Sequence, residues 1–238
     1  MDTHSRDARL AIVDNSIDPS IYRPVEHWAK HLDIPFESFR APEGRLPGLD
    51  EGFSHFIITG SEASVLERDA WVEDETEFIR EVVSQGYPTL GSCYGHQLIA
   101  LALGGPDRVR RSPRPEVGWY PIDIHVKGDI LGEEGRGYAF CSHFDEAVGL
   151  GADFHILAST PDCPIQAFKV ASRPVWGIQF HPEIDIPAAR QFLGSLAGLG
   201  LPTSPVFAEA LRMEPRDSDL IRGIVRHFLG SKKAPEKS

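Results

Sequence analysis

The chain has 238 residues, of which 41% are hydrophobic and 25% charged, and a formal net charge of −11 at pH 7. This length allows one sizeable core, and the acidic charge disfavours binding to nucleic acids or to anionic membranes. The three cysteines, Cys93, Cys141 and Cys163, make no disulfide framework and no C-x-x-C pair typical of zinc sites. No apolar run approaches the roughly 18 residues that a membrane span needs. We therefore expect a cytoplasmic protein without a metal or a cofactor.

The first hundred residues alternate short apolar runs with segments of helical spacing. We predict strands over residues 10–13, 34–39, 53–59 and 88–90, and helices over residues 25–32, 69–84 and 98–103. Strands that alternate with helices predict an α/β fold with a doubly wound, mostly parallel sheet and helices on both faces. In such sheets, ligands bind at the carboxyl ends of the strands.

The pattern changes after residue 105. Short strands without intervening helices are predicted over residues 108–112, 118–126, 137–142, 155–159, 164–170 and 174–180. This is typical of a small antiparallel extension at one edge of the sheet. Helices are predicted again over residues 187–198, 206–213 and 218–229. We expect a main domain over residues 1–198, a helical extension over 199–230 and a disordered tail over 231–238.

Cys93 lies in the sequence Gly-Ser-Cys-Tyr-Gly-His-Gln at residues 91–97, between a predicted strand and a predicted helix. Glycines two positions on either side remove Cβ atoms that would collide in a sharp turn. The sulfur would sit at the first turn of a helix, where free N–H groups and the dipole favour a thiolate. A lone buried cysteine is more often a small hydrophobic residue, so a nucleophile requires a partner base.

That base is offered by Gly-Ile-Gln-Phe-His-Pro-Glu at residues 177–183, where a predicted strand ends. Residues two apart in extended backbone point the same way, so Glu183 can hold the imidazole of His181 while the ring faces Cys93. A His-Pro-Glu sequence alone is usually a surface turn. The two motifs together indicate a cysteine nucleophile with a histidine base.

These motifs resemble those of the class I glutamine amidotransferases, especially the free-standing branch similar to the amidotransferase half of GMP synthase. The likeness covers residues 8–195 and includes the motifs at residues 58–65, 116–119 and 142–148. The resemblance implies a flavodoxin-like fold, with residues 1–198 as the catalytic domain. It also implies hydrolysis of the glutamine side-chain amide through a γ-glutamyl thioester on Cys93, with release of ammonia.

The same resemblance implies roles for the surrounding residues. His181 would be the general base and then the acid, and Glu183 would orient it. The backbone N–H groups of Gly60 and Tyr94 would form an oxyanion hole, since a glycine allows close approach and a helix start offers free donors. The residues expected to bind the substrate are Ser61, Gln97, His143 and Asp145, with Asp145 facing the α-ammonium group.

Four arginines, Arg108, Arg110, Arg111 and Arg114, form a basic run in this acidic chain. We interpret the run as a solvated strand edge, in preference to a docking patch for an anionic partner. His96, Cys141 and Trp119 are expected to be packed, and Cys163 to be a loop thiol.

Three functions remain open at this stage. The protein could supply ammonia in trans to a separate synthetase or another acceptor, or it could be a self-sufficient hydrolase of γ-glutamyl amides or peptides. A non-enzymatic regulatory or scaffold protein is the weakest alternative. The 238 residues contain no G-x-x-x-x-G-K phosphate loop, so ATP-dependent chemistry is expected on another protein. The sequence leaves open the acceptor, the oligomeric state and whether the segment after residue 198 docks a partner, forms a dimer or caps the pocket.

Overall fold

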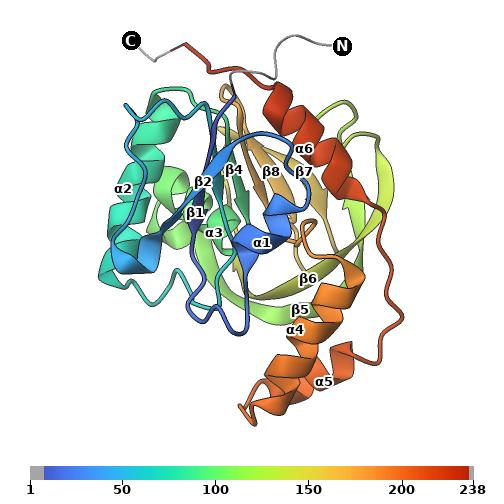
Figure 1. The fold of residues 1–238 in the computed structure, drawn as a ribbon. Helices are drawn as coiled ribbons and strands as arrows, with labels where there is room; N and C mark the ends of the chain where they lie inside the picture. The colour runs from blue at the N-terminus through green and yellow to red at the C-terminus, as the bar shows by residue number, and fades with distance from the viewer. Residues whose placement is uncertain (1–7, 236–238) are drawn as a thin grey trace.

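The computed structural model describes residues 8–235. One nine-stranded sheet, with the strand order β2-β1-β3-β4-β9-β8-β7-β5-β6, runs through the molecule and is flanked by helices (Figure 1). The predicted α/β fold with helices on both faces and an antiparallel extension is confirmed. No helix among these residues is long and apolar enough to cross a membrane.

The parallel part of the sheet contains five strands. They are β1 (Leu10–Asp14), β2 (Phe36–Arg40), β3 (His55–Ile58), β4 (Thr89–Ser92) and β9 (Val175–Ile178). All residues of β1, β3, β4 and β9 are buried, as expected for strands covered on both faces. Register places Gly91 beside both Ile58 and Gly177, so the segments after β3, β4 and β9 meet at one sheet edge.

Helices cover both faces of the parallel strands. On one face, α2 (Ala70–Ser84) and α3 (Tyr94–Gly104) contribute apolar side chains to a shared core. On the other face, α1 (Pro24–Ala29) and α6 (Leu220–Gly230) do the same. Helix α3 begins at Tyr94, directly after Cys93, as expected for a sulfur at the first turn of a helix, and the backbone around Gly95 packs against β3.

The antiparallel part continues the same sheet. It consists of β5 (Val109–Ile124), β6 (Gly135–Ala147), β7 (Phe154–Ser159) and β8 (Ala167–Val170). Strand β9 joins the two parts, since it pairs parallel with β4 and antiparallel with β8. The two strands predicted over residues 108–112 and 118–126 are one strand, β5. Its register shifts between Arg111 and Glu116, where two prolines lack the N–H that the ladder needs.

The C-terminal helices separate into two groups. Helices α4 (Ile186–Gly198) and α5 (Ser204–Ala210) pack together at the lower end of the molecule, whereas α6 returns to the sheet (Figure 1). Two 3-10 helices, Ala41–Glu43 and Pro106–Arg108, complete the elements.

The tail corrects one expectation. Residues 231–235 were expected to be disordered, but they lie against the body: the Ala234 N–H donates to the Gly86 carbonyl at 2.8 Å, and the Lys233 ammonium lies 3.8 Å from the Tyr87 ring centroid. Backbone hydrogen bonding and a cation–π contact therefore hold a segment that its polar composition alone would leave free. Residues 236–238 of the predicted tail lie outside the described residues.

Candidate active site

Cys93 occupies a strained turn between β4 and α3. Its φ is +48° and its ψ is −104°, a conformation that a residue with a side chain rarely adopts. The Cys93 N–H donates to the Ile178 carbonyl at 2.8 Å, which ties the turn to the end of β9. A Cβ on Gly95 would lie 2.2 Å from the Ile58 carbonyl oxygen, and one on Gly91 would lie 2.5 Å from the backbone of Gly95. Both glycines are therefore required by the turn.

His181 and Glu183 follow β9 and lie side by side, as the spacing predicted. The His181 Nδ1 lies 2.9 Å from the Glu183 Oε1, and the Glu183 side chain is fully buried. His181 and Cys93 line the same cavity. Burial alone would lower the pKa of His181, but the charges of Cys93 and Glu183 outweigh it and raise that pKa. The arrangement favours the imidazolium form of His181.

Tyr22 contacts both His181 and Glu183, and the sequence did not reveal this third member of the group. It precedes α1, and its hydroxyl donates to the Glu183 Oε1 at 3.3 Å and lies 3.5 Å from the His181 Nδ1. Its ring meets the imidazole edge-on, with the centroids 5.9 Å apart. Burial and the Glu183 charge raise the pKa of the Tyr22 phenol, which keeps it a neutral donor. No local pattern links Tyr22 to residues that lie about 160 positions later.

The two predicted oxyanion donors flank the turn. Tyr94 is the first residue of α3, so its N–H is one of those without a partner inside the helix. Gly60 follows β3, and the preceding Thr59 carbonyl accepts the Gly95 N–H at 3.1 Å, which fixes this loop to the turn. A Cβ on Gly60 would lie 2.8 Å from the His181 Cε1. Only glycine fits there, although donation to an oxyanion stays a prediction.

The predicted substrate-binding residues gather at the polar end of the cavity. The Asp145 carboxylate accepts a hydrogen bond from the Ser64 hydroxyl at 2.5 Å and forms an ion pair with the Arg111 guanidinium at 3.0 Å. The Gln97 amide donates to the Asp145 carbonyl at 2.9 Å and to the Gln179 Oε1 at 3.1 Å. Gln97 therefore braces the strand that carries Asp145. Ser64 and Arg111 were missed as site residues.

The other two predicted binding residues also line the cavity. Ser61 is half-buried there, and its hydroxyl accepts the Ala63 N–H at 3.0 Å. His143 is buried, and each of its ring nitrogens already has a partner: the Glu116 Oε2 at 3.1 Å and the Asp145 carbonyl at 3.0 Å. His143 therefore shapes the cavity wall more directly than it offers a free polar group.

The basic run lies on β5, and Arg110, Arg111 and Arg114 are exposed, as expected of a solvated strand edge. The sequence did not predict that these three arginines are paired with carboxylates. Arg110 contacts the buried Glu146 at 2.7 Å, Arg111 contacts Asp145, and Arg114 pairs with Asp162. The carboxylates neutralise these cations, and Arg111 lines the cavity. The charges were visible in the sequence, but their partners come from other segments.

Among the described residues, His143 belongs to a group of three potential metal ligands. Ligand atoms of Glu116, Cys141 and His143 come within 4.8 Å of one another. The Glu116 carboxylate already accepts hydrogen bonds from the Thr160 hydroxyl at 2.5 Å and the Gln166 amide at 2.5 Å. These bonds describe a buried network that supports β6, and we assign no metal to it.

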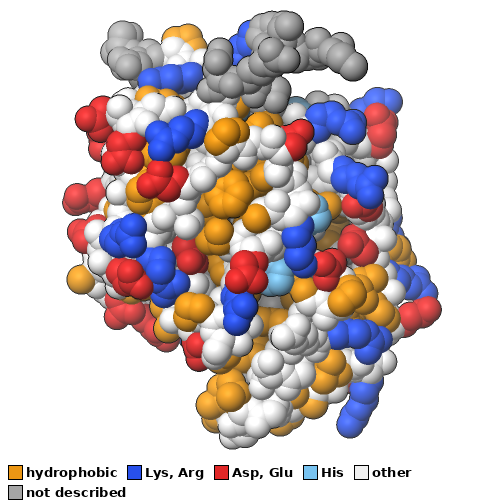
Figure 2. Space-filling view, in the orientation of Figure 1, with side chains coloured by type: hydrophobic (Ala, Val, Ile, Leu, Met, Phe, Trp, Pro, Cys, Tyr) orange, Lys and Arg blue, Asp and Glu red, His pale blue; other side chains and the backbone are white. Residues whose placement is uncertain are grey.

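The cavity that contains Cys93 has a volume of about 540 Å³. Its polar end holds Ser61, Ser64 and Asp145, and its other end is formed largely by apolar side chains of the α4–α5 region. Near this region, at the lower end of the molecule, hydrophobic side chains also reach the surface (Figure 2). Nearly all predicted site residues line the cavity. Glu183 lies behind His181, and Gly60 lies against it.

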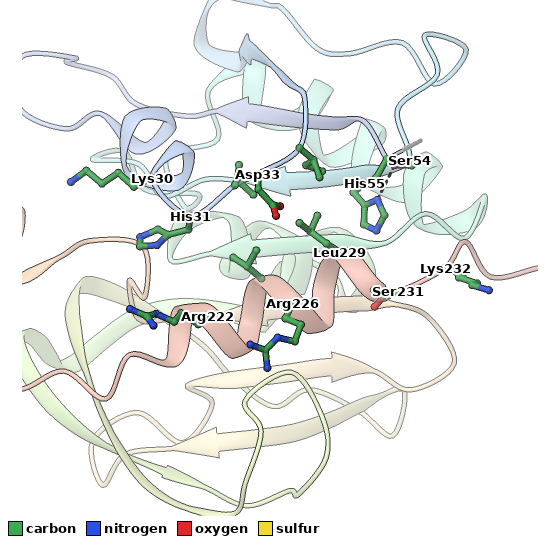
Figure 3. Close-up of a pocket in the computed structure, with 15 residues that line it drawn as sticks. Lys30, His31, Asp33, Ser54, His55, Arg222, Arg226, Leu229, Ser231 and Lys232 are labelled. Atoms are coloured by element: carbon green, nitrogen blue, oxygen red, sulfur yellow. Dashed lines mark hydrogen bonds between the residues drawn. The ribbon is translucent and has the colours of Figure 1, made fainter. Parts of the chain in front are cut away.

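A second hollow, of about 1120 Å³, lies between α6 and the segment that follows α1 (Figure 3). We call it the α6 groove. Its walls carry cations and histidines, among them Arg226, Lys232 and His31, but none of the predicted site residues. Lys30 and Arg222 at its rim already pair with Asp185 at 2.7 Å and Asp219 at 2.8 Å. The cluster around Cys93 therefore remains the candidate active site.

The arrangement of the α/β sheet defines the fold class of this protein as flavodoxin-like. The sheet carries a cysteine at a strained strand-to-helix turn, which faces a histidine–glutamate pair. The chain belongs to the glutamine amidotransferase class-I family, whose sequence model matches residues 16–193. The resemblance seen in the motifs is thereby confirmed.

Curated relatives and solved structures agree with this family. One subunit of the glutamine-hydrolyzing GMP synthase of Saccharolobus solfataricus is 36% identical over 148 residues, covering 60% of this chain and 76% of that protein. The GMP synthase of Thermus thermophilus is 34% identical over 180 residues, covering 70% of this chain and 34% of that protein. With the GMP synthase of Aeropyrum pernix the match covers only 24% of the relative's length.

Two solved glutamine amidotransferases share the fold. The structure from Thermotoga maritima has a TM-score of 0.74 at 19% identity and covers 94% of this chain and 99% of its own. The structure from Methylobacillus flagellatus has a TM-score of 0.74 at 20% identity and covers 98% of this chain and 99% of its own.

Proposed function

We propose that this protein hydrolyses the side-chain amide of glutamine, or of a related γ-glutamyl amide, through a γ-glutamyl thioester on Cys93. One observation carries the proposal. Cys93, held at φ +48° at the start of a helix, shares a cavity with an imidazole that Glu183 orients at 2.9 Å. A strained nucleophile beside an oriented base is the arrangement that acyl transfer requires.

Acylation uses the thiolate–imidazolium pair. The Cys93 sulfur attacks the amide carbon, a C–S bond forms, and the carbonyl oxygen gains negative charge that the N–H groups of Gly60 and Tyr94 stabilise. Collapse of this intermediate breaks the C–N bond. His181 donates its proton to the departing nitrogen, so that a neutral amine or ammonia leaves.

Deacylation reverses these roles. A water molecule gives a proton to His181 and attacks the thioester carbon, the C–S bond breaks, and glutamate leaves. Glu183 keeps the ring in one orientation in both halves, and Tyr22 holds Glu183 in place. At the far end, the buried Asp145 carboxylate suits the α-ammonium group of a γ-glutamyl substrate.

In the first version of this function, the ammonia passes in trans to an acceptor, which a separate synthetase would bind. The likeness to a protein named as one subunit of a GMP synthase supports this version. The second version is a self-sufficient hydrolase of γ-glutamyl amides. It is favoured by the apolar end of the cavity, which a product as small and polar as ammonia does not need.

Labelling with an electrophilic glutamine analogue, such as a diazo ketone, tests the proposal. We expect one adduct, on Cys93, located by peptide mass spectrometry and suppressed by excess glutamine. Cys141 and Cys163 serve as internal controls, because both are fully buried and burial raises the pKa of each thiol. An adduct on another residue, or labelling that glutamine does not suppress, would contradict the proposal.

A further inference from the structure

The cavity over Cys93 is divided by polarity. Its polar end holds Ser64, Asp145 and Arg111, which suit the amino-acid end of a γ-glutamyl compound. Its opposite end is a wall of six apolar side chains: Phe144, Ile184, Phe192, Leu196, Leu201 and Phe207. We call this the apolar wall. Four of the six come from α4, α5 and the loop between them.

The chemistry decides which part of the substrate meets the apolar wall. His181 must deliver its proton to the departing nitrogen, so the leaving group lies on the His181 side of Cys93. On that side apolar groups contribute to the lining, because Ile184 follows the His181–Glu183 turn and Phe192 packs edge-on against Tyr22, with the centroids 5.8 Å apart. The Glu62 carboxylate, whose charge acts on Tyr22, is a polar group of the same lining. The amide nitrogen therefore points at the apolar wall, and the α-ammonium group points away from it.

The wall is built as part of the fold. Phe207 is 5% exposed, and its ring meets Phe144 at 5.9 Å and Phe192 at 6.4 Å between centroids, both edge-on. Interlocked aromatic rings of this kind form a preformed surface. Ammonia gains nothing from such a surface, whereas an apolar group is transferred out of water by it. Pockets of about 300–1,000 Å³ hold ligands larger than a single amino acid, and this cavity, at about 540 Å³, falls in that range.

We propose that the preferred substrates are γ-glutamyl amides whose nitrogen carries an apolar alkyl or aryl group. This inference rests on the proposed function and changes only the leaving group. The C–S bond to Cys93 forms, the C–N bond breaks, and His181 protonates an apolar primary amine in place of ammonia. Water then hydrolyses the thioester to glutamate. The segment after residue 198 thus contributes to specificity by capping the pocket with Leu201 and Phe207.

A matched set of substrates tests this preference. Release of glutamate is measured for glutamine, γ-glutamyl butylamide and γ-glutamyl (2-methoxyethyl)amide, whose substituents have the same length but differ by one ether oxygen. We expect kcat/KM for the butylamide to exceed that for glutamine and for the ether by about tenfold or more, since one methylene in an apolar pocket is worth about 10–200-fold.

Two neighbouring leucines give a matched pair of variants. Leu201 lines the cavity and is 48% exposed, whereas Leu199 is 49% exposed and is not part of the lining. Because both are exposed, neither substitution removes core packing. L201D is expected to lower the ratio of kcat/KM for the butylamide to that for glutamine by about fivefold or more, since a charge on the wall opposes an apolar group. L199D is expected to leave both values unchanged.

The outcomes separate the two proposals. Equal kcat/KM for the butylamide and the ether, faster turnover of glutamine than of the butylamide, or equal effects of L201D and L199D would overturn the inference about the leaving group. If Cys93 forms the glutamine-suppressible adduct in those cases, the proposed function still stands. If no adduct forms on Cys93 and no amide is hydrolysed, the proposed function itself fails.

Discussion

The α6 groove and the cavity over Cys93 are two hollows that differ in size and in the chemistry of their lining residues. The α6 groove is about twice as large as the cavity over Cys93, at about 1120 Å³ against about 540 Å³. Its rim cations Lys30 and Arg222 are paired with carboxylates, and its walls lie between a helix and the amino-terminal ends of strands (Figure 3). The smaller cavity lies at the carboxyl ends of β3, β4 and β9, where the chain turns sharply.

The difference shows that volume alone does not locate a reactive site. A site needs groups that are held in unfavourable states, such as the strained backbone of Cys93 or the buried charge of Glu183, and a fold that holds them there. Cys93 lines the cavity, and Glu183 lies directly behind the cavity residue His181. The following predictions test this contrast between the two hollows, from the largest expected effect to the smallest.

Replacing Cys93 by alanine should remove the nucleophile and lower kcat for glutamine or γ-glutamyl amides by about 10⁴-fold or more. The measurement is glutamate release. The matched change in the α6 groove is Arg226→Ala, an exposed residue for which no effect on kcat is expected. A loss of activity in R226A comparable to that in C93A would break the distinction between the two hollows.

Glu183→Gln keeps the shape of the side chain and removes its charge. Without that charge the imidazolium is less stable, so kcat should fall by about 10²–10⁴-fold. The pKa of His181 should fall as well, because the Glu183 carboxylate is one of the charges that raise it. Titration of the ring by nitrogen NMR checks this shift. An unchanged His181 pKa with unchanged kcat would show that Glu183 does not orient the base.

Helix α2 carries a buried acid. Glu75 of α2 is fully buried, neither of its carboxyl oxygens has a hydrogen-bond partner among residues 8–235, and burial raises its pKa from 4.5 to about 8. Between these two values the unfolded chain releases the Glu75 proton while the folded chain keeps it. The free energy of unfolding should therefore fall as pH rises through this window and level off above pH 8.

Glu75→Gln should remove this pH dependence. The variant is expected to be more stable than the parent protein at pH 8 by a few kcal/mol, since each pKa unit corresponds to about 1.4 kcal/mol. It should differ little at pH 4.5, where the carboxyl is neutral in the folded state. Urea unfolding at pH 4.5, 6.5 and 8 measures the effect. A parallel pH profile for both proteins would mean that Glu75 is not the titrating group.

Glu183 contacts lining residues of both hollows and gives the finest comparison. On the cavity side, the Tyr22 hydroxyl contacts its carboxylate at 3.3 Å. On the groove side, the Nε2 of His31, which lines the α6 groove, lies 3.3 Å from the Glu183 backbone carbonyl. Tyr22→Phe should lower kcat by about fivefold, the value of one hydrogen bond of about 1 kcal/mol. His31→Ala should change kcat by less than about twofold, because it leaves the carboxylate in place. Equal effects of the two changes would contradict the assignment of Tyr22 as a positioning residue.

Much of the fold followed from local patterns. The buried apolar runs gave the parallel strands, and the order of strands and helices gave the α/β class. The antiparallel part was predicted as separate strands, and the continuity of β5 was missed because two prolines hide a strand whose register shifts between Arg111 and Glu116. The start of α3 agrees with the predicted turn at Cys93, but only the close contact of Gly95 with Ile58 shows why a residue that is unfavourable in a helix lies in its first turn.

Like the fold, the candidate site has some parts that the sequence predicted and others that it did not. Cys93, His181 and Glu183 could be found in the sequence because each lies in a short motif whose spacing sets the local backbone. The α4–α5 region gave no such signal, since its apolar residues have the spacing of any amphipathic helix. Its place over the cavity depends on how Phe207 meets Phe144 and Phe192.

By itself, the sequence determined the strained turn at Cys93, the histidine–glutamate pair and the class of sheet that carries them, because backbone geometry and strand periodicity are local. Only the tertiary structure decided that Tyr22 supports Glu183, that Arg111 pairs with Asp145 and that an apolar wall lines the cavity over Cys93. These contacts join segments that are far apart in the chain, and packing between such segments leaves no periodic trace in either one.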